Sequence, residues 1–296
     1  MRIGLDIGGT KTDAVLLGSG NHILRALRYV TGKGADAVVD TIVRAVTDLV
    51  ADENVDAIGI GIPGVVDTVS GHVFHAVNLD IADLDLARII EARTATSVRV
   101  ENDVKAAALG AWHLLNLSGS AAYLNLGTGL SAGVVINGEL WRGAGGSSGE
   151  LGHIPIDPQG PLCNCGQRGC LETVASGGGI SRWWQSSAEF PVRDLFDRAD
   201  ADDPVASQAR QRVVDGVASA LRILALTVDV ETIVIGGGLS RLGDRVILPV
   251  VERIRDWEAN SPFVASLHLS SRIQCAPHGA HLASIGAALI GIPTLR

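Results

Sequence analysis

The stretch MRIGLDIGGTKTDAVLL (1–17) decides the fold. Within residues 2–17, two runs of alternating apolar residues are joined by the glycine turn Gly8-Gly9. An apolar period of two is typical of strands, and a short glycine turn between two such runs is typical of a hairpin. The apolar positions expected to share one face are Ile3, Leu5, Ile7, Ala14 and Leu16. The segment therefore predicts two antiparallel strands, not a strand that leads into a helix.

The same plan returns at residues 121–136, which contain AYLNLGTGLSAGVVI. This second copy has Asn125, Gly127, Thr128 and Gly129 where the first has Asp6, Gly8, Gly9 and Thr10. Two copies of one opening hairpin indicate two lobes built on related plans.

The rest of the chain mixes helical and strand patterns. Helical apolar spacing predicts helices over about 39–50, 104–115, 171–185, 204–228 and 280–291, and short buried runs predict strands over 57–62, 98–100 and 232–235. This mixture is typical of α/β lobes, and 296 residues suffice for two. We expect a small α/β lobe from residues 1–112 plus 282–296 and a large α/β lobe with a metal loop from residues 113–281.

Composition excludes several partners. The 24 basic and 32 acidic residues give a net charge of −8, and no basic run offers a footprint for nucleic acid. Asp6 interrupts the first residues, which lack the apolar core of a signal peptide, and later apolar stretches are too short for a membrane span. We expect a cytoplasmic protein that binds neither nucleic acid nor membrane.

Glycine turns that follow strands occur three times, and such turns bring backbone N–H groups against phosphate oxygens. They are Gly8-Gly9, Gly127-Thr128-Gly129 and Gly236-Gly237-Gly238. Each, taken alone, is equally an ordinary turn.

Side chains around the first turn make it the most specific of the three. Asp6 can hold a metal ion or its water, and Thr10 and Lys11 offer a hydroxyl and a cation to a polyphosphate. The alternative for Lys11 is an exposed turn lysine.

Three cysteines and one histidine predict a metal site. His153, Cys163, Cys165 and Cys170 supply one imidazole and three thiolates within eighteen positions. Four such ligands close a tetrahedral zinc site and leave no open position for a reactive water, so the zinc would be structural. The alternative is a set of buried free cysteines beside a core histidine.

Asp103 lies just past the strand at 98–100, at a strand-to-helix junction where α/β proteins commonly gather ligands. The alternative is that Asn102 or Asp103 only caps the helix that begins at Val104. Spacing alone leaves the two readings open.

Five ordered segments, spread over nearly the whole chain, resemble the ROK family of sugar kinases and repressors. They are DIGGTKTDAVLL (6–17), ENDVKAAALGAW (101–112), GTGLSAGVVINGELWRGAGGSSGELGH (127–153), CNCGQRGCLE (163–172) and VIGGGLS (234–240). The resemblance implies a two-lobed actin-like ATPase (ribonuclease H-like) fold, in which each lobe is a mixed sheet with flanking helices. Because the first phosphate loop begins six residues into the sequence, we expect no DNA-binding extension of the kind that the family's repressors carry.

The resemblance also implies ATP-dependent phosphorylation of a hexose, with glucose and its 6-hydroxyl leading, Asp103 as the general base, and Mg²⁺ bound with ATP near Asp6. His153 would bind zinc and face the sugar, and the protein would be a homodimer. Besides Asp103, the sugar pocket would be lined by Gly64, Asn78, Asn102, Glu150, His153 and Glu172. For Glu172, an acid in the first turn of a helix is an alternative. The nucleotide would meet Asp6, Gly8, Gly9, Thr10, Lys11, Gly127, Thr128, Gly129, Gly236, Gly237 and Gly238.

The choice of hexose stays open. NLDIADLD (78–85) lacks the glycine and aromatic residue that many sugar-kinase relatives have there. Mannose, fructose, allose and N-acetylhexosamines remain alternatives. A sugar sensor without catalysis is the rival class, but it would not need Asp6, Asp103 or the phosphate loops.

Overall fold

The computed structural model describes residues 1–50 and 53–291, which form two compact units. The first unit comprises Met1–Gly119, Gly133–Ser148 and Gly279–Arg296, and the second comprises Ser120–Ala132 and Gly149–His278. The lobe boundaries predicted from the sequence stay a prediction. Within the described ranges, no helix combines the length and apolar composition that a membrane crossing requires.

The first unit is built on a five-stranded sheet in the order β3-β2-β1-β4-β8. Strands β1, β2 and β3 are antiparallel, whereas β1, β4 and β8 are parallel. The strands are β1 (Arg2–Ile7), β2 (Lys11–Leu17), β3 (Ile23–Val30), β4 (Ala57–Ile62) and β8 (Val98–Asn102). The predicted opening hairpin is thus present, with Ile7 opposite Thr12 next to the turn.

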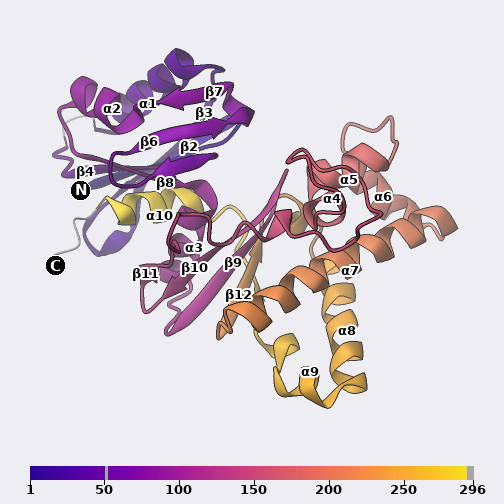
Figure 1. The fold of residues 1–296 in the computed structure, drawn as a ribbon. Helices are drawn as coiled ribbons and strands as arrows, with labels where there is room; N and C mark the ends of the chain where they lie inside the picture. Colours follow the sequence, from indigo (N-terminus) through magenta and orange to yellow (C-terminus); the bar gives the residue numbers. More distant parts are fainter. Residues whose placement is uncertain (51–52, 292–296) are drawn as a thin grey trace. The chain divides into compact units, whose positions relative to one another are not determined.

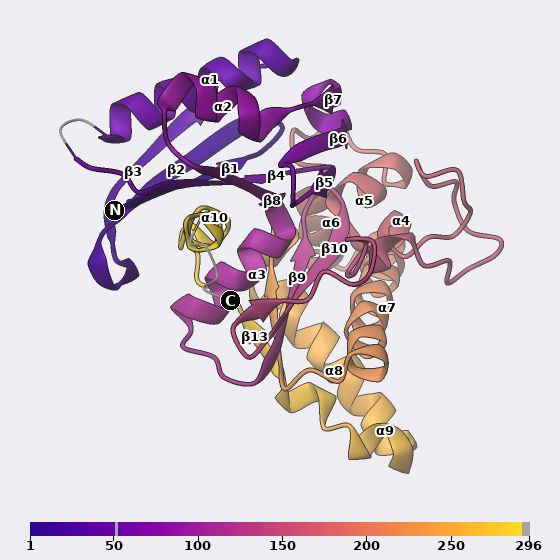
Figure 2. The same ribbon diagram turned by 60° about the vertical axis from the view of Figure 1, so that its left-hand side comes forward.

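Helices cover both faces of this sheet (Figures 1 and 2). On one face lie α1 (Ala35–Val50) and α2 (Leu86–Thr94). Helix α1 forms because apolar residues recur on one side of it, and that side is buried against the sheet. Its buried apolar residues are Val38, Val39, Ile42, Ala45, Val46 and Leu49.

The other face is covered by α10 (Leu282–Ile290), which also packs against α3 (Asp103–Leu114). Glycines allow this close approach. A Cβ at Gly59 of β4 would lie 1.7 Å from the Ala287 carbonyl oxygen, and one at Gly286 would lie 1.7 Å from that of Ala106. The apolar C-terminal segment therefore forms an interior helix of the first unit.

A small antiparallel sheet, β5-β6-β7, completes the first unit together with a short hairpin. A 3₁₀ turn, η2, joins β6 to β7 and carries Asn78. The bounds are β5 (Val65–Asp67), β6 (His72–Ala76), η2 (Val77–Leu79), β7 (Ile81–Leu84), β10 (Leu130–Ile136) and β11 (Glu139–Leu140); a further 3₁₀ turn, η1, spans Ser19–Asn21.

The second unit places helices around three parallel strands, β9, β12 and β13. Asp203 caps α7, a helix of 24 residues, and Pro204 occupies its first turn. The strands are β9 (Ser120–Leu126), β12 (Thr232–Gly236) and β13 (Ile273–Cys275). The helical segments are η3 (Leu151–His153), α4 (Glu172–Ala175), α5 (Gly177–Trp183), α6 (Pro191–Asp200), α7 (Pro204–Thr227), η4 (Leu239–Leu242), α8 (Asp244–Asn260), α9 (Pro262–Ser266) and η5 (Leu269–Ser271).

The helix predicted over 171–185 is two helices. Ser176 is extended and separates α4 from α5, and its hydroxyl accepts a hydrogen bond from the Gly179 amide at 3.0 Å. A serine in this conformation ends one helix and caps the next. The break directs the N-terminus of α5 at the turn after β9, because Gly177 and Gly178 donate to the carbonyls of Gly127 and Thr128.

Candidate active site

The first glycine turn lies between β1 and β2. The Gly8 amide donates to the Lys11 carbonyl at 2.9 Å, which closes the turn. A Cβ at Gly9 would lie 3.2 Å from the Asn78 carbonyl oxygen, so η2 packs directly on the turn. Thr10 is exposed, and the Lys11 ammonium lies 3.7 Å from the Asp13 carboxylate. The structure thus brings the predicted phosphate loop and Asn78 together.

Three acids gather where β1 meets this turn. The pKa of Asp6 is raised to about 8, first by burial and then by the nearby charges of Asp103 and Asp13, whereas Lys11 opposes the shift. Asp13 is occupied by the Arg28 guanidinium, which donates to both of its oxygens. Asp6 and Asp103 are both half-buried. A cation placed beside them would relieve their repulsion and favour the charged form of both.

Asn102, not Asp103, provides the principal cap of α3. The Asn102 side-chain oxygen accepts from the amides of Val104 at 3.0 Å and Lys105 at 3.2 Å. Its side-chain nitrogen donates to the Gly64 carbonyl at 3.5 Å. Asp103 is the first residue of the helix, and one of its oxygens accepts from the Val104 amide at 3.0 Å. Gly64, Asn102 and Asp103 are therefore neighbours.

The second glycine turn, after β9, is held by backbone contacts. Gly127 donates to the Gly129 carbonyl at 3.0 Å, and the α5 N-terminus docks on the turn as described above. Glu172 also approaches the turn, since a Cβ at Gly129 would lie 3.3 Å from Glu172 Oε2.

A pocket of about 560 Å³ opens beside this turn. Its polar rim combines the β9 turn, the α5 N-terminus and η4, and its apolar wall is the segment that leads into α6. The lining includes Gly127, Thr128, Gly177, Gly178, Ser181, Phe190, Arg193, Gly238 and Arg241. Two of the predicted phosphate-loop glycines, Gly236 and Gly237, are closely packed: a Cβ at Gly236 would lie 2.2 Å from the Tyr123 hydroxyl, and one at Gly237 would lie 2.6 Å from the Asn125 side-chain oxygen.

Sequence reasoning missed several residues of this pocket. The run Gly177-Gly178-Gly179 carried a signal, because it is a further glycine-rich stretch that opens a helix. Phe190, Arg193 and Arg241 carried none, since only the fold brings α6 and η4 to the β9 turn. Phe190 is 57% exposed, and the Arg193 guanidinium lies 5.6 Å from its ring centre.

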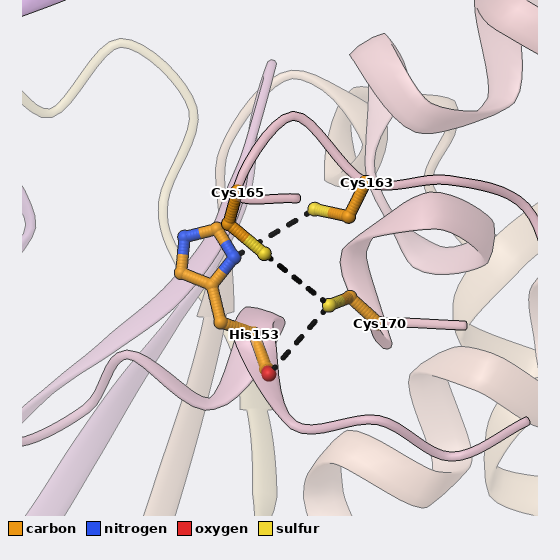
Figure 3. A group of neighbouring side chains, drawn as sticks. All are labelled: His153, Cys163, Cys165 and Cys170. Atoms are coloured by element: carbon orange, nitrogen blue, oxygen red, sulfur yellow. Dashed lines mark hydrogen bonds between the residues drawn. The ribbon is translucent and has the colours of Figure 1, made fainter. Parts of the chain in front are cut away.

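The cysteine cluster assembles as predicted from its spacing (Figure 3). One ligand atom from each of His153, Cys163, Cys165 and Cys170 lies within 4.8 Å of the others, so the group can hold a metal ion. Cys163 Sγ lies 3.8 Å from His153 Nδ1, and Cys165 Sγ lies 3.6 Å from Cys170 Sγ. Adjacent ligands of a tetrahedral zinc ion are about 3.7 Å apart, so the donor set fits that ion.

The cluster also orients Glu172 and His153. The Cys163 thiol donates to Glu172 Oε1 at 3.2 Å, and His153 Nδ1 lies 3.9 Å from the same oxygen. The other ring nitrogen of His153 faces away from the sulfur atoms (Figure 3). Glu150 is exposed and immediately precedes η3, the turn that ends at His153. The second unit thus holds Glu172 and His153 together and Glu150 three residues from His153.

Comparisons with known proteins give the class. The ROK family model matches residues 2–292, so the chain belongs to the ROK family. It is 34% identical over 276 residues to the glucokinase of Thermotoga maritima, covering 86% of this chain and 87% of that protein. It is 32% identical over 245 residues to an N-acetylmannosamine kinase of Vibrio cholerae, covering 80% and 83%.

A solved structure matches over almost the full length. The ROK family glucokinase of Streptomyces griseus, determined in complex with glucose and AMPPNP, has a TM-score of 0.81 and 30% identity, and the match covers 98% of each chain. The predicted actin-like ATPase fold, with mixed sheets and flanking helices, is confirmed.

Proposed function

We propose that the protein transfers the γ-phosphoryl group of ATP to a hexose, with glucose as the leading acceptor and its 6-hydroxyl as the nucleophile. The observation that carries this proposal is the grouping of Asp103 and Asp6 beside the glycine turn of the first unit. A phosphate loop can bind the phosphoryl donor ATP, and a carboxylate at the start of a helix can act as the base. The similarity to glucokinases supports glucose in particular.

Asp103 is the proposed general base. A neutral alcohol is a poor nucleophile until its proton has an acceptor within hydrogen-bond reach. The Asn102 side chain is fixed because it accepts from the Val104 amide and donates to the Gly64 carbonyl. This supports a role for Asn102 and Gly64 in aligning a sugar hydroxyl next to Asp103. Asn78, on the segment that packs on Gly9, is the fourth hexose contact proposed from the first unit.

The second unit is proposed to supply Glu150, His153 and Glu172 to the hexose. Sugar hydroxyls both donate and accept, so carboxylates and an imidazole suit them. His153 has one ring nitrogen directed at the cysteines and one free of them, which supports its dual role at metal and sugar.

The pocket beside the β9 turn is the proposed site for the base and ribose of ATP. Its volume of about 560 Å³ and its apolar wall suit a nucleoside, and the backbone N–H groups of Thr128 and Gly238 suit its phosphates, with Gly127 lining the pocket beside them. Gly129, Gly236 and Gly237 would support this turn and shape it. In the first unit, Gly8, Gly9, Thr10 and Lys11 are proposed to meet the phosphates.

Two metals accompany this proposal. Asp6 would hold Mg²⁺, directly or through water, and the ion would supply neutralising charge to the phosphates of ATP. His153, Cys163, Cys165 and Cys170 would hold a structural Zn²⁺, since they leave no ligand position for a reactive water. Burial raises the pKa of Cys163 to about 12, so a bound cation is what would keep this sulfur a thiolate.

Other acceptors, location and assembly belong to the same proposal. The similarity to an N-acetylmannosamine kinase favours an N-acetylhexosamine as the second candidate acceptor. A cytoplasmic location accords with the need for ATP and reduced cysteines. The homodimer stays a prediction, which light scattering of the purified protein tests.

Asp103→Asn tests the proposed function. The amide keeps the shape of the carboxylate but cannot accept the proton, so we expect turnover with glucose and ATP to fall about 10³-fold while glucose still binds. Calorimetry of glucose binding beside a turnover assay separates the two effects, and Asp36→Asn, at an exposed acid on α1, is the matched control. Near wild-type turnover in Asp103→Asn would remove Asp103 as the base.

A further inference from the structure

Lysine is rare in this chain, and its positions are unusual. The sequence has three lysines and 21 arginines, and all three lysines lie in the first unit. Lys11 belongs to the first glycine turn. Lys33 donates to the carbonyl of Asn78, a proposed sugar contact. The third, Lys105, is buried two residues after Asp103, where the proposed reaction has no use for it.

Lys105 occupies an unfavourable position for a cation. Only 4% of the residue is exposed, and it lies in the first turn of α3, where the helix dipole disfavours positive charge. Its ammonium donates to the Gly146 carbonyl at 2.8 Å. A lysine ammonium is a compact donor that suits a single carbonyl, whereas the planar fork of an arginine is best matched by a carboxylate or a phosphate. The hydrogen bond to Gly146 is thus the contact that offsets the cost of burying this charge.

A second buried charge, two residues before Asp103 in the sequence, binds the same loop. Glu101, which is 2% exposed, accepts from Arg142 Nε at 2.7 Å. Its other oxygen accepts from the Asn102 amide at 3.0 Å, which ties the ion pair to the strand end that carries the helix cap. Glu101 and Lys105 therefore hold residues 142–148 from positions two before and two after Asp103.

The loop at 142–148 is closed at its base, where the Ser148 hydroxyl donates to the Trp141 carbonyl at 2.6 Å. Its middle has few contacts. A Cβ added at Gly145 or at Gly146 would meet no atom within 4 Å, and residues 143–147 are exposed. Lys105 is thus the buried anchor of a glycine-rich segment that would otherwise be loosely held.

We propose that Lys105 and Glu101 are positioning residues that hold the loop 142–148 beside Asp103. The inference rests on the proposed function, because Ser148 leads within two residues to Glu150, a proposed hexose contact. Holding the loop fixes the position of the chain up to Ser148 relative to the helix that carries Asp103. A small displacement of positioning groups is enough to weaken catalysis strongly.

Lys105→Met tests the proposal, because it keeps the apolar stem and removes the charge and the donor. We expect the KM for glucose to rise about tenfold, the KM for ATP to stay within twofold, and amide exchange across residues 143–148 to quicken. Arg99→Met, at an exposed position of β8, is the control and should change none of these. Arg142→Met breaks the ion pair with Glu101 by changing its less buried partner. If Lys105→Met does not fold, Arg142→Met should raise the KM for glucose and leave the KM for ATP within twofold.

Unchanged exchange at 143–148, or quicker exchange with both KM values unchanged, would overturn the proposal. A parallel rise of both KM values would also overturn it, because it would indicate general loosening. The exchange measurement needs no turnover. If the wild type phosphorylated no hexose, quicker exchange in Lys105→Met than in the wild type would still support the anchor, and the proposed function alone would fail.

Discussion

The two glycine turns that open the duplicated segments differ in what surrounds them. The turn after β1 has charged neighbours: Asp6 at its start, Lys11 at its end, and Asp103 close enough to raise the pKa of Asp6. The turn after β9 is instead supported by backbone, since two amides of the α5 N-terminus donate to its carbonyls. One hairpin plan has therefore been used for two kinds of site.

The difference separates chemistry from binding. Carboxylates and a lysine beside the first turn suit metal binding, proton transfer and phosphate charge. Amides, glycines and the apolar wall beside the second turn suit a nucleoside and its phosphates. Substitutions at the two turns should therefore alter different kinetic constants.

After Asp103→Asn, the largest expected effect comes from the cluster of His153 and the three cysteines, which belongs to the second unit and contains no catalytic acid. Cys165→Ser should lose the proposed zinc and lower kcat/KM for glucose about 10- to 100-fold, because His153 and Glu172 lose their shared support. Metal analysis of the purified variant and glucose titrations measure this. Cys275→Ser, an exposed cysteine outside the cluster, is the control. Active wild-type enzyme that contains no zinc would refute the structural role of the metal.

We expect Asp6, at the first turn, to make the stability of the protein depend on pH. The pKa of Asp6 is raised to about 8, so between pH 4 and 8 the folded chain binds more protons at Asp6 than the unfolded chain. Asp6 should therefore make the free energy of unfolding decline as pH rises through this window, by at most about 1.4 kcal/mol per pH unit. Asp6→Asn should remove this decline. Urea unfolding at pH 5, 6, 7 and 8 measures it, and an unaltered slope in the variant would assign the dependence to another group.

The smallest expected effect lies at the apolar wall of the second unit. Phe190→Ala should raise the KM for ATP about fivefold, because an aromatic face beside Arg193 is lost from the proposed nucleoside pocket. The KM for glucose should not change. Phe263→Ala is the control, since Phe263 is similarly exposed, at 65%, but does not line the pocket. A rise in the KM for glucose alone would contradict the assignment of nucleoside binding to the turn after β9.

Local patterns predicted the elements that carry their own signal. The opening hairpin, α1, β4 and α7 follow from apolar periodicity and capping residues, and the cysteine cluster follows from its ligand spacing. Helix α8 was missed, because Pro249 in its interior and a sequence of mixed charge obscure its apolar face. The break at Ser176 was missed, although the glycine run 177–179 that follows it disfavours a helix interior and was the available signal.

Contacts between distant segments were beyond the sequence. Nothing local indicates that Phe190 and Arg241 share a pocket with Gly127, or that Lys105 holds Gly146. Asn102 and Asp103 are both good capping residues, and only the coordinates assign the main cap to Asn102. Such pairings depend on packing between elements that are far apart in the chain.

Turnover of ATP with a panel of hexoses is the direct test of the proposed hexose phosphorylation. The wild-type protein with Mg²⁺ and ATP is assayed against glucose, mannose, fructose, allose and N-acetylmannosamine, and ADP and the sugar phosphate are both quantified. We expect equimolar ADP and hexose 6-phosphate, with the highest kcat/KM for glucose. ADP formation that no hexose stimulates would contradict it.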